Sequence, residues 1–168
     1  MKRLFKVTVL LFLMVLVSGA FIAPQVECAE RYKWINSTAT SSTDLDTVTF
    51  AIRVKKPMVY FDSWLRNTYS QQGIIDTIAS RKRNGLSVEG YENLSHSLHH
   101  VVFALNPATV EMKYMFKAII DYAKDGTVLD NTTIDSPNYV AIPPESVAEA
   151  KLAGILEYAH TAGIQPTE

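Results

Sequence analysis

Residues 112–123, MKYMFKAIIDYA, carry the strongest strand pattern in this chain of 168 residues. Apolar and aromatic side chains alternate with charged ones such as Lys113 and Lys117, and a repeat of two is typical of a β-strand with two different faces. Lys124-Asp125-Gly126 follows, and its glycine favours a tight hairpin turn. Residues 127–134, TVLDNTTI, are then the return strand. The side chains expected on one face of the first strand are Met112, Tyr114, Phe116, Ala118, Ile120 and Tyr122.

Three further strands are predicted upstream of this hairpin. Tyr32–Ile35 and Thr47–Arg53 are rich in aromatic and β-branched residues, and the polar segment 36–44 between them is expected to be a loop. Pro57 ends the second strand because it cannot donate a ladder hydrogen bond. Met58–Tyr69 alternates over its whole length. Its expected faces are Val59, Phe61, Leu65 and Tyr69 on one side, and Tyr60, Asp62, Trp64, Arg66 and Thr68 on the other.

The segment Leu94–Leu105 fits two structures. Its leucines and valines form a helical stripe, and periodicity alone slightly favours a helix. Val101-Val102-Phe103 has strong β character, and the turn at Asn106-Pro107 leads directly into the strand at 112–123. The β character and the turn together favour a strand in a hairpin, and the helix is kept as the alternative.

Two helices are predicted. In SQQGIIDTIASRKRNG, residues 70–85, the isoleucines have helical spacing and Asn84-Gly85 is a stop signal. Arg81-Lys82-Arg83 suits the negative end of that helix dipole. In the C-terminal segment, Ser146 and Glu149 fit a capping box. The expected buried stripe there is Val147, Ala148, Leu152, Ile155, Leu156 and Ala159. The predicted fold is α+β, with an antiparallel sheet of about six strands packed against a C-terminal helix and one inserted helix.

Three of the four histidines lie together in Ser95–His100, SHSLHH. On a strand, His96 and His100 share a face but stand about 13 Å apart, and His99 faces the other way. Zinc ligands lie about 2.0–2.1 Å from one ion, so a strand cannot bring these three rings to one metal. On a helix two of them could bind one ion. We therefore interpret them as surface histidines of a half-exposed strand, and we assign no metal, cofactor or catalytic residue.

The acidic groups are also interpreted as structural. Asp44 and Asp46 form a D-x-D without the glycine and distal glutamate of a calcium loop. Asp121, Asp125 and Asp130 also lack the calcium-loop spacing, and the hairpin accounts for Asp125-Gly126. Asp62 and Arg66 share a strand face and are expected to be solvated. The chain contains no G-x-S-x-G, P-loop or dinucleotide-binding fingerprint.

The N-terminus predicts export. Lys2, Arg3 and Lys6 precede the apolar run Val7–Val17, which is the layout of a secretory signal peptide. Residues 1–28 are taken as the signal and 29–168 as a single α+β domain, with cleavage after Cys28 preferred over cleavage after Ala20. An uncleaved anchor is the alternative, since the mostly apolar span from Val7 is at the short edge of the roughly 17–25 residues that cross a bilayer.

Composition narrows the partners. The net charge is −1 and no long basic run occurs, so nucleic acid is not an expected partner. Contact with a membrane is expected only through the signal segment. Cys28 is the only cysteine, so the exported domain has no internal disulfide and depends on its hydrophobic core.

Five segments carry a resemblance to a known family. They are YKWINST with LDTVTF, FDSWLRNTY, GYENLSHSL, and DYAKDGTVLDNTTIDSPNYVAIPPESVAE. Together they resemble small exported bacterial proteins grouped with surface-adhesin protein E. The matching positions include Trp34 with Asp46, Trp64, Tyr122 with Asp125-Gly126, and Ile142–Ser146. The chain lacks the cysteine pair that members of this group often carry.

The resemblance implies an antiparallel sheet packed against helices and a non-enzymatic role in the cell envelope or at the surface. It implies binding of host matrix or serum proteins, allows a homodimer, and offers no catalytic residue. Sheet faces rich in Tyr and Trp, such as Tyr60 and Trp64, are the expected contact surfaces. The alternative function is a periplasmic carrier of a small ligand or metal that uses the concave face of the sheet and His96–His100.

Overall fold

The computed structural model describes residues 30–167, and the predicted signal peptide lies outside them. Eight strands, two α-helices and one short 3-10 helix make up this part of the chain. Their bounds are β1 Tyr32–Ser37, β2 Ser41–Asp46, β3 Ala51–Lys55, β4 Met58–Tyr69, α2 Gln71–Arg83, η1 Tyr91–Asn93, β5 Leu94–Asn106, β6 Glu111–Ala123, β7 Val128–Thr133, β8 Val140–Ala141 and α3 Val147–Thr161.

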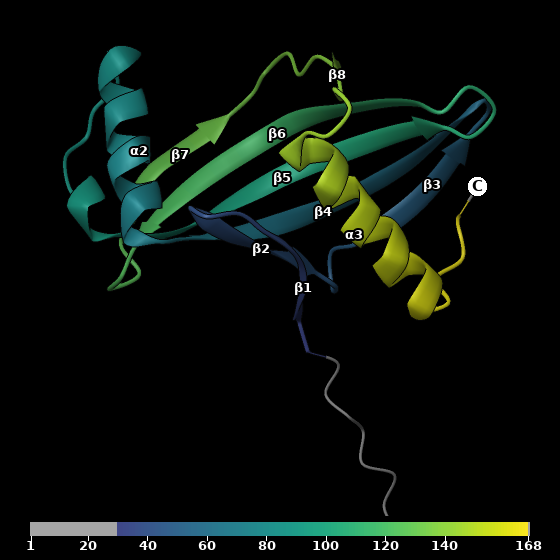
Figure 1. The fold of residues 1–168 in the computed structure, drawn as a ribbon, viewed down its shortest axis with the longest axis horizontal. Coiled ribbons are helices and arrows are strands. Elements are labelled where there is room, and N and C mark those ends of the chain that lie inside the picture. The colour runs from purple at the N-terminus through teal and green to yellow at the C-terminus, as the bar shows by residue number, and fades with distance from the viewer. Residues whose placement is uncertain (1–29, 168) are drawn as a thin grey trace, which may run out of the picture.

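All eight strands belong to one antiparallel sheet in the order β1-β2-β4-β5-β6-β7. The long strand β4 pairs with β3 along its first half and with β2 along its second half. The long strand β6 pairs in the same way with β8 and then with β7. Figure 1 shows α3 lying across one face of the sheet and α2 standing at one end. The predicted α+β class with an inserted and a C-terminal helix is confirmed.

The main core lies between α3 and the sheet. Alternation along β4 and β5 turns Phe61, Leu65, Val101 and Phe103 toward the helix, and all four are buried. Gly154 lets α3 approach β1 closely, since a Cβ there would lie 2.4 Å from the carbonyl oxygen of Ile35. The expected stripe of α3 is correct for Leu152, Ile155 and Ala159 and wrong for Val147 and Leu156, which are exposed.

A second, smaller core holds α2 and η1 against the end of the sheet. Ile74, Tyr91 and Leu94 are buried there together. Ser70 caps α2 by accepting a hydrogen bond from the Gly73 amide at 3.2 Å, and this satisfies one free donor at the helix start. No helix among residues 30–167 is long and apolar enough to cross a membrane.

The sheet has eight strands where about six were expected, because two polar or very short strands were assigned to connections. β2 lies in the predicted loop 36–44 and extends to Asp46. Leu45 is the only apolar residue in this strand, so its sequence has no hydrophobic alternation that would predict a strand. Residues 47–49, predicted to begin a strand, form a turn in which the Asp46 carboxylate accepts a hydrogen bond from the Val48 amide at 3.1 Å.

A β-bulge in β6 overturns the single face predicted for that strand. Phe116 pairs with Val101 and Ala118 pairs with His100, so Lys117 is the extra residue. Because one inserted residue reverses the alternation, Met112, Tyr114 and Phe116 face α3, whereas Ala118, Ile120 and Tyr122 face the opposite side.

Candidate functional site

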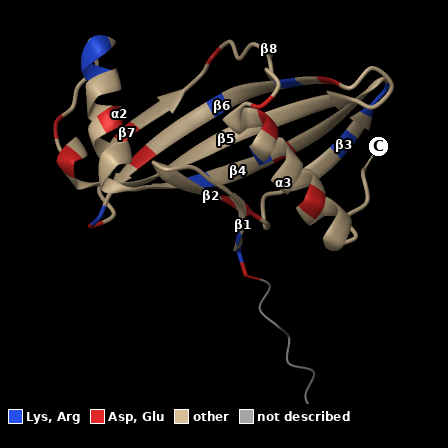
Figure 2. Ribbon diagram, viewed as in Figure 1, with Lys and Arg blue, Asp and Glu red and all other residues tan. Residues whose placement is uncertain are grey.

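One face of the sheet is packed by the helices, and the opposite face is covered by neither. The residues that alternate with the core positions of β4 and β5 define this second surface, called here the helix-free face. Its members are Tyr60, Asp62, Trp64, Arg66, His96, Leu98, His100, Lys117, Ile120 and Tyr122. Figure 2 shows basic positions along β3 and β6, separate from the basic end of α2.

Asp62 is the charged centre of the helix-free face. Its carboxylate accepts hydrogen bonds from His100 Nε2 at 2.7 Å, from Lys117 Nζ at 2.9 Å and from the Arg53 guanidinium. Burial raises the pKa of Asp62, but the hydrogen bonds from Lys117 and His100 outweigh that effect, so its pKa lies below the usual value. Asp62 is therefore ionised at neutral pH, and the expectation of a solvated carboxylate is wrong.

Stacked rings flank this charged centre. Trp64 stacks on His100 with ring centroids 5.0 Å apart and an interplanar angle of 21°. His96 stacks on Tyr122 at 5.0 Å and 9°. All four rings are partly exposed. Burial, with the charge of Arg66, lowers the pKa of His96, so this ring is neutral at pH 7.

Arginine–carboxylate pairs border the stacked rings. The Arg66 guanidinium lies 4.0 Å from the centroid of the Tyr32 ring and donates to Asp44 at 2.8 Å. Arg31 donates to the buried Asp46 at 2.9 Å. Both members of the D-x-D are therefore paired with arginine, which agrees with their structural interpretation.

A hollow of about 150 Å³ opens beside these pairs. Trp64, Leu98 and Ile120 form its apolar wall, and Arg31 and Asp46 form its polar wall. The face therefore combines a small apolar depression with stacked aromatic rings and fixed charges.

The strand interpretation correctly separates the faces of the histidines, but the expectation that all three are surface residues is wrong for His99, which lines a cavity under α3. His96 and His100 lie on the helix-free face, and His99 lies on the side of α3, where its ring meets Phe116 edge-on at 5.4 Å. Among residues 30–167 no three His, Cys, Asp or Glu side chains are placed to hold one metal ion.

The remaining acidic residues have separate structural partners. Asp125 Oδ1 accepts from the Thr127 amide at 2.9 Å in the β6–β7 turn. Asp121 is buried on the side of α2, where it accepts from the Tyr91 hydroxyl at 2.6 Å and from Ser97. Arg81 pairs with Asp130 at 2.8 Å. Each of these carboxylates therefore makes a structural contact, and Arg81 stabilises the contact of α2 with the sheet.

Sequence reasoning identified Tyr60, Trp64 and the histidines but missed the cluster around Asp62. Lys117 lies 55 residues from Asp62 along the chain, and the register of β4, β5 and β6 decides that the two side chains meet. No local spacing carries that signal. One indication was present, since an aspartate in the middle of a long strand needs a cationic partner when it is buried.

Comparison of the chain with protein-family models, with curated proteins and with solved structures found no match.

Proposed function

We propose that the chain is an exported, non-enzymatic protein of the cell envelope or surface that binds a protein partner through the helix-free face. The observation that supports this most directly is the uncovered array of Trp64, Tyr122, His96 and His100 around the ion-paired Asp62. Tryptophan, tyrosine and arginine are the residues that most often dominate the energy of protein interfaces.

The energetics of such a face favour binding. Stacking and ion pairs hold its rings and guanidinium groups in place before a partner arrives, so fewer side-chain rotamers are lost on association. The hollow beside Trp64 would take one apolar side chain of the partner. The surrounding charges, both signs of which are present, would fix its orientation. Host matrix and serum proteins are the partner class that the surface-adhesin resemblance implies.

Binding is tested with the purified chain against a panel of extracellular-matrix and serum proteins by biolayer interferometry. Trp64→Ala should weaken the interaction with any bound protein at least tenfold. Ile75→Ala is the matched control, because Ile75 is 50% exposed on α2, away from the helix-free face. Equal losses in both variants, or none in Trp64→Ala, would place the interface elsewhere.

Export to the surface needs its own test. Protease treatment of intact producing cells, followed by mass spectrometry, should release peptides from residues 30–168 without lysis. If these peptides are found only after the envelope is opened, the surface role is refuted, and the partner should be sought among periplasmic ligands.

A further inference from the structure

A cavity of about 190 Å³ lies between α3 and the sheet, on the side opposite the helix-free face. Most of its wall is apolar, and Val147, which is 49% exposed, lies among the lining residues at the start of α3. The apolar lining includes Leu65, Val101, Phe103, Tyr114 and Phe116. An apolar cavity of about 150 Å³ in another protein takes up benzene, so this volume is enough for a ring or a short branched chain.

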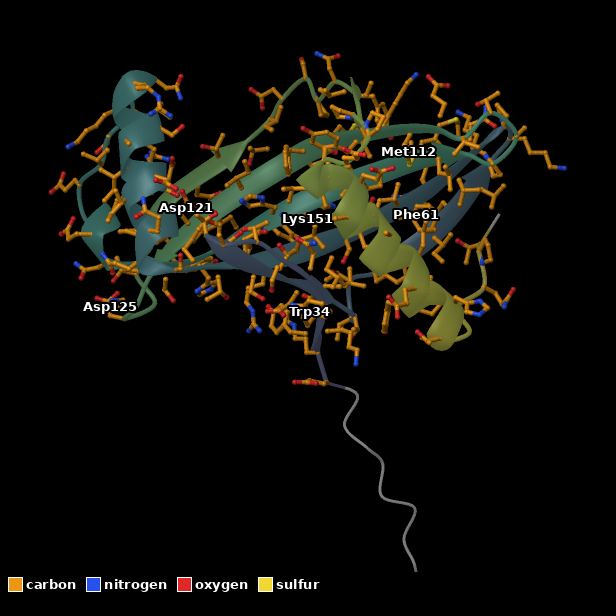
Figure 3. The ribbon with its side chains drawn as sticks, in the orientation of Figure 1. Trp34, Phe61, Met112, Asp121, Asp125 and Lys151 are labelled. Carbon is orange, nitrogen blue, oxygen red and sulfur yellow. The ribbon has the colours of Figure 1, made fainter. Side chains whose placement is uncertain are left out.

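Lys151 supplies the charge of the cavity. It lies one turn into α3 and reaches toward β4, where its Nζ donates to Asn67 Oδ1 at 2.7 Å (Figure 3). Within residues 30–167 it forms no ion pair with an acidic side chain. Asn67 Oδ1 also accepts from Thr43 Oγ1 at 2.8 Å, and the Asn67 amide nitrogen is buried without a partner. An ammonium group on an apolar cavity without a carboxylate is costly to hold there, and an added anion would relieve that cost.

His99 stands beside Lys151 in the same cavity. Burial, together with the charge of Lys151, lowers the pKa of His99 to about 4, so the ring is neutral at pH 7 and one ring nitrogen carries a proton to donate. Its ring nitrogens make no hydrogen bond to any other residue in the part of the chain that the structure describes. The cavity therefore offers two donors from two different elements, α3 and β5.

We propose that this cavity binds a small organic carboxylate, with the carboxylate held by Lys151 and His99 and the apolar group of the ligand buried among Leu65, Phe103 and Phe116. One ammonium and one imidazole match the two oxygens of a carboxylate. A phosphate would leave most of its acceptors unmatched against this wall, and a cation would be repelled by Lys151. This site lies on the opposite side of the sheet from the helix-free face, so it stands independently of the protein-binding proposal.

The test is calorimetric titration of the full chain at pH 7 with benzoate and isovalerate. Their neutral amides, benzamide and isovaleramide, fill the same volume without the charge. At least one carboxylate should bind with a Kd of about 1 mM or tighter, and its amide should bind at least tenfold more weakly.

Two variants and one control locate the site. Lys151→Met should weaken carboxylate binding at least tenfold, and Lys124→Met, at an exposed turn position, should leave it unchanged. Val147→Phe should weaken benzoate binding by narrowing the exposed side of the cavity without removing Lys151. Equal binding of a carboxylate and its amide, unchanged binding in Lys151→Met, or no saturable binding of either carboxylate would overturn the proposal.

Discussion

Replacing Lys151 by methionine should make the protein more stable at neutral pH. Burial lowers the pKa of Lys151 from 10.5 to about 8. Because a difference of one in pKa corresponds to about 1.4 kcal/mol, holding the ammonium in the folded state costs about 3 kcal/mol. Methionine keeps the length of the apolar stem and removes the charge. The variant loses the hydrogen bond to Asn67, worth about 1 kcal/mol, while Thr43 still donates to that oxygen. The expected net gain is about 2 kcal/mol at pH 7.

The pH dependence separates this cause from a general packing effect. Between pH 8 and 10.5 the unfolded wild-type chain binds a proton at Lys151 that the folded chain does not bind. The free energy of unfolding of the wild type should therefore rise with pH across this interval, and the same contribution is lost as pH falls toward 8. His99 and Tyr114 are the other titratable side chains of this cavity, and His99 does not titrate in this interval because burial lowers its pKa to about 4. The advantage of Lys151→Met should therefore disappear by about pH 10.

Urea denaturation followed by circular dichroism at pH 7, 8, 9 and 10 measures both proteins. Lys124→Met is the control, and its difference from the wild type should be small and independent of pH. If Lys151→Met is less stable than the wild type at pH 7, the ammonium has a compensating partner and the argument from burial is wrong. Parallel pH profiles of wild type and variant would refute it equally.

Three further substitutions test the contacts that build the fold and the helix-free face. Tyr91→Phe should lower the free energy of unfolding by about 1–2 kcal/mol, because the buried Asp121 carboxylate loses the hydrogen bond from the Tyr91 hydroxyl at 2.6 Å. An unchanged urea midpoint would contradict this. Gly154→Ala should destabilise the protein by about 1–3 kcal/mol in thermal unfolding, since the new methyl group would clash with the carbonyl oxygen of Ile35. A gain in stability, which is the usual result of Gly→Ala in a helix, would show that α3 can move away from β1. Asp62→Asn should lower the free energy of unfolding by about 2 kcal/mol at pH 7. This is less than the loss expected for a fully buried ion pair, because the cationic partners of Asp62 reach solvent. The wild type should also lose stability as pH falls below 3.8 through the lowered pKa of this carboxyl, and urea denaturation between pH 5 and 2 should show a smaller loss in the asparagine variant.

The cost of Lys151 bears on function as well as on stability. A side chain that lowers stability and lies on an apolar cavity is more readily explained by a ligand than by packing, because packing alone would be better served by methionine or leucine. The same reasoning does not extend to Arg81 or Lys117. Each is paired with aspartate in the fold and therefore stabilises it directly.

The two faces of the sheet have different roles in these proposals. The helix-packed face holds the core and the cavity at Lys151, and the helix-free face carries Asp62 and the stacked rings. A single protein could use both, one for a small carboxylate and the other for a macromolecule. Trp64→Ala and Lys151→Met separate them, because each should affect one kind of binding and leave the other intact.

Local pattern was sufficient for most of the elements. The alternation along Met58–Tyr69 correctly placed Phe61 and Leu65 on one face and Trp64 on the other, because side-chain direction on a strand depends only on the neighbouring residues. Ser146 marked the start of the C-terminal helix for the same reason, since its side chain accepts a hydrogen bond from an amide three residues away. β2 was missed because a strand built from serine, threonine and aspartate has almost no hydrophobic alternation.

The sequence by itself determined the α+β class and the two helices, and it left open whether Leu94–Leu105 is the strand that separates His99 from His96 and His100. Only the tertiary structure decided which side chains meet across the sheet. The register of β4, β5 and β6 brings Lys117 to Asp62, 55 positions away, and the packing of α3 brings Lys151 to Asn67, 84 positions away. Strand direction and helix caps follow from interactions over a few residues, whereas these contacts depend on strand register and helix docking, which are properties of the whole folded chain.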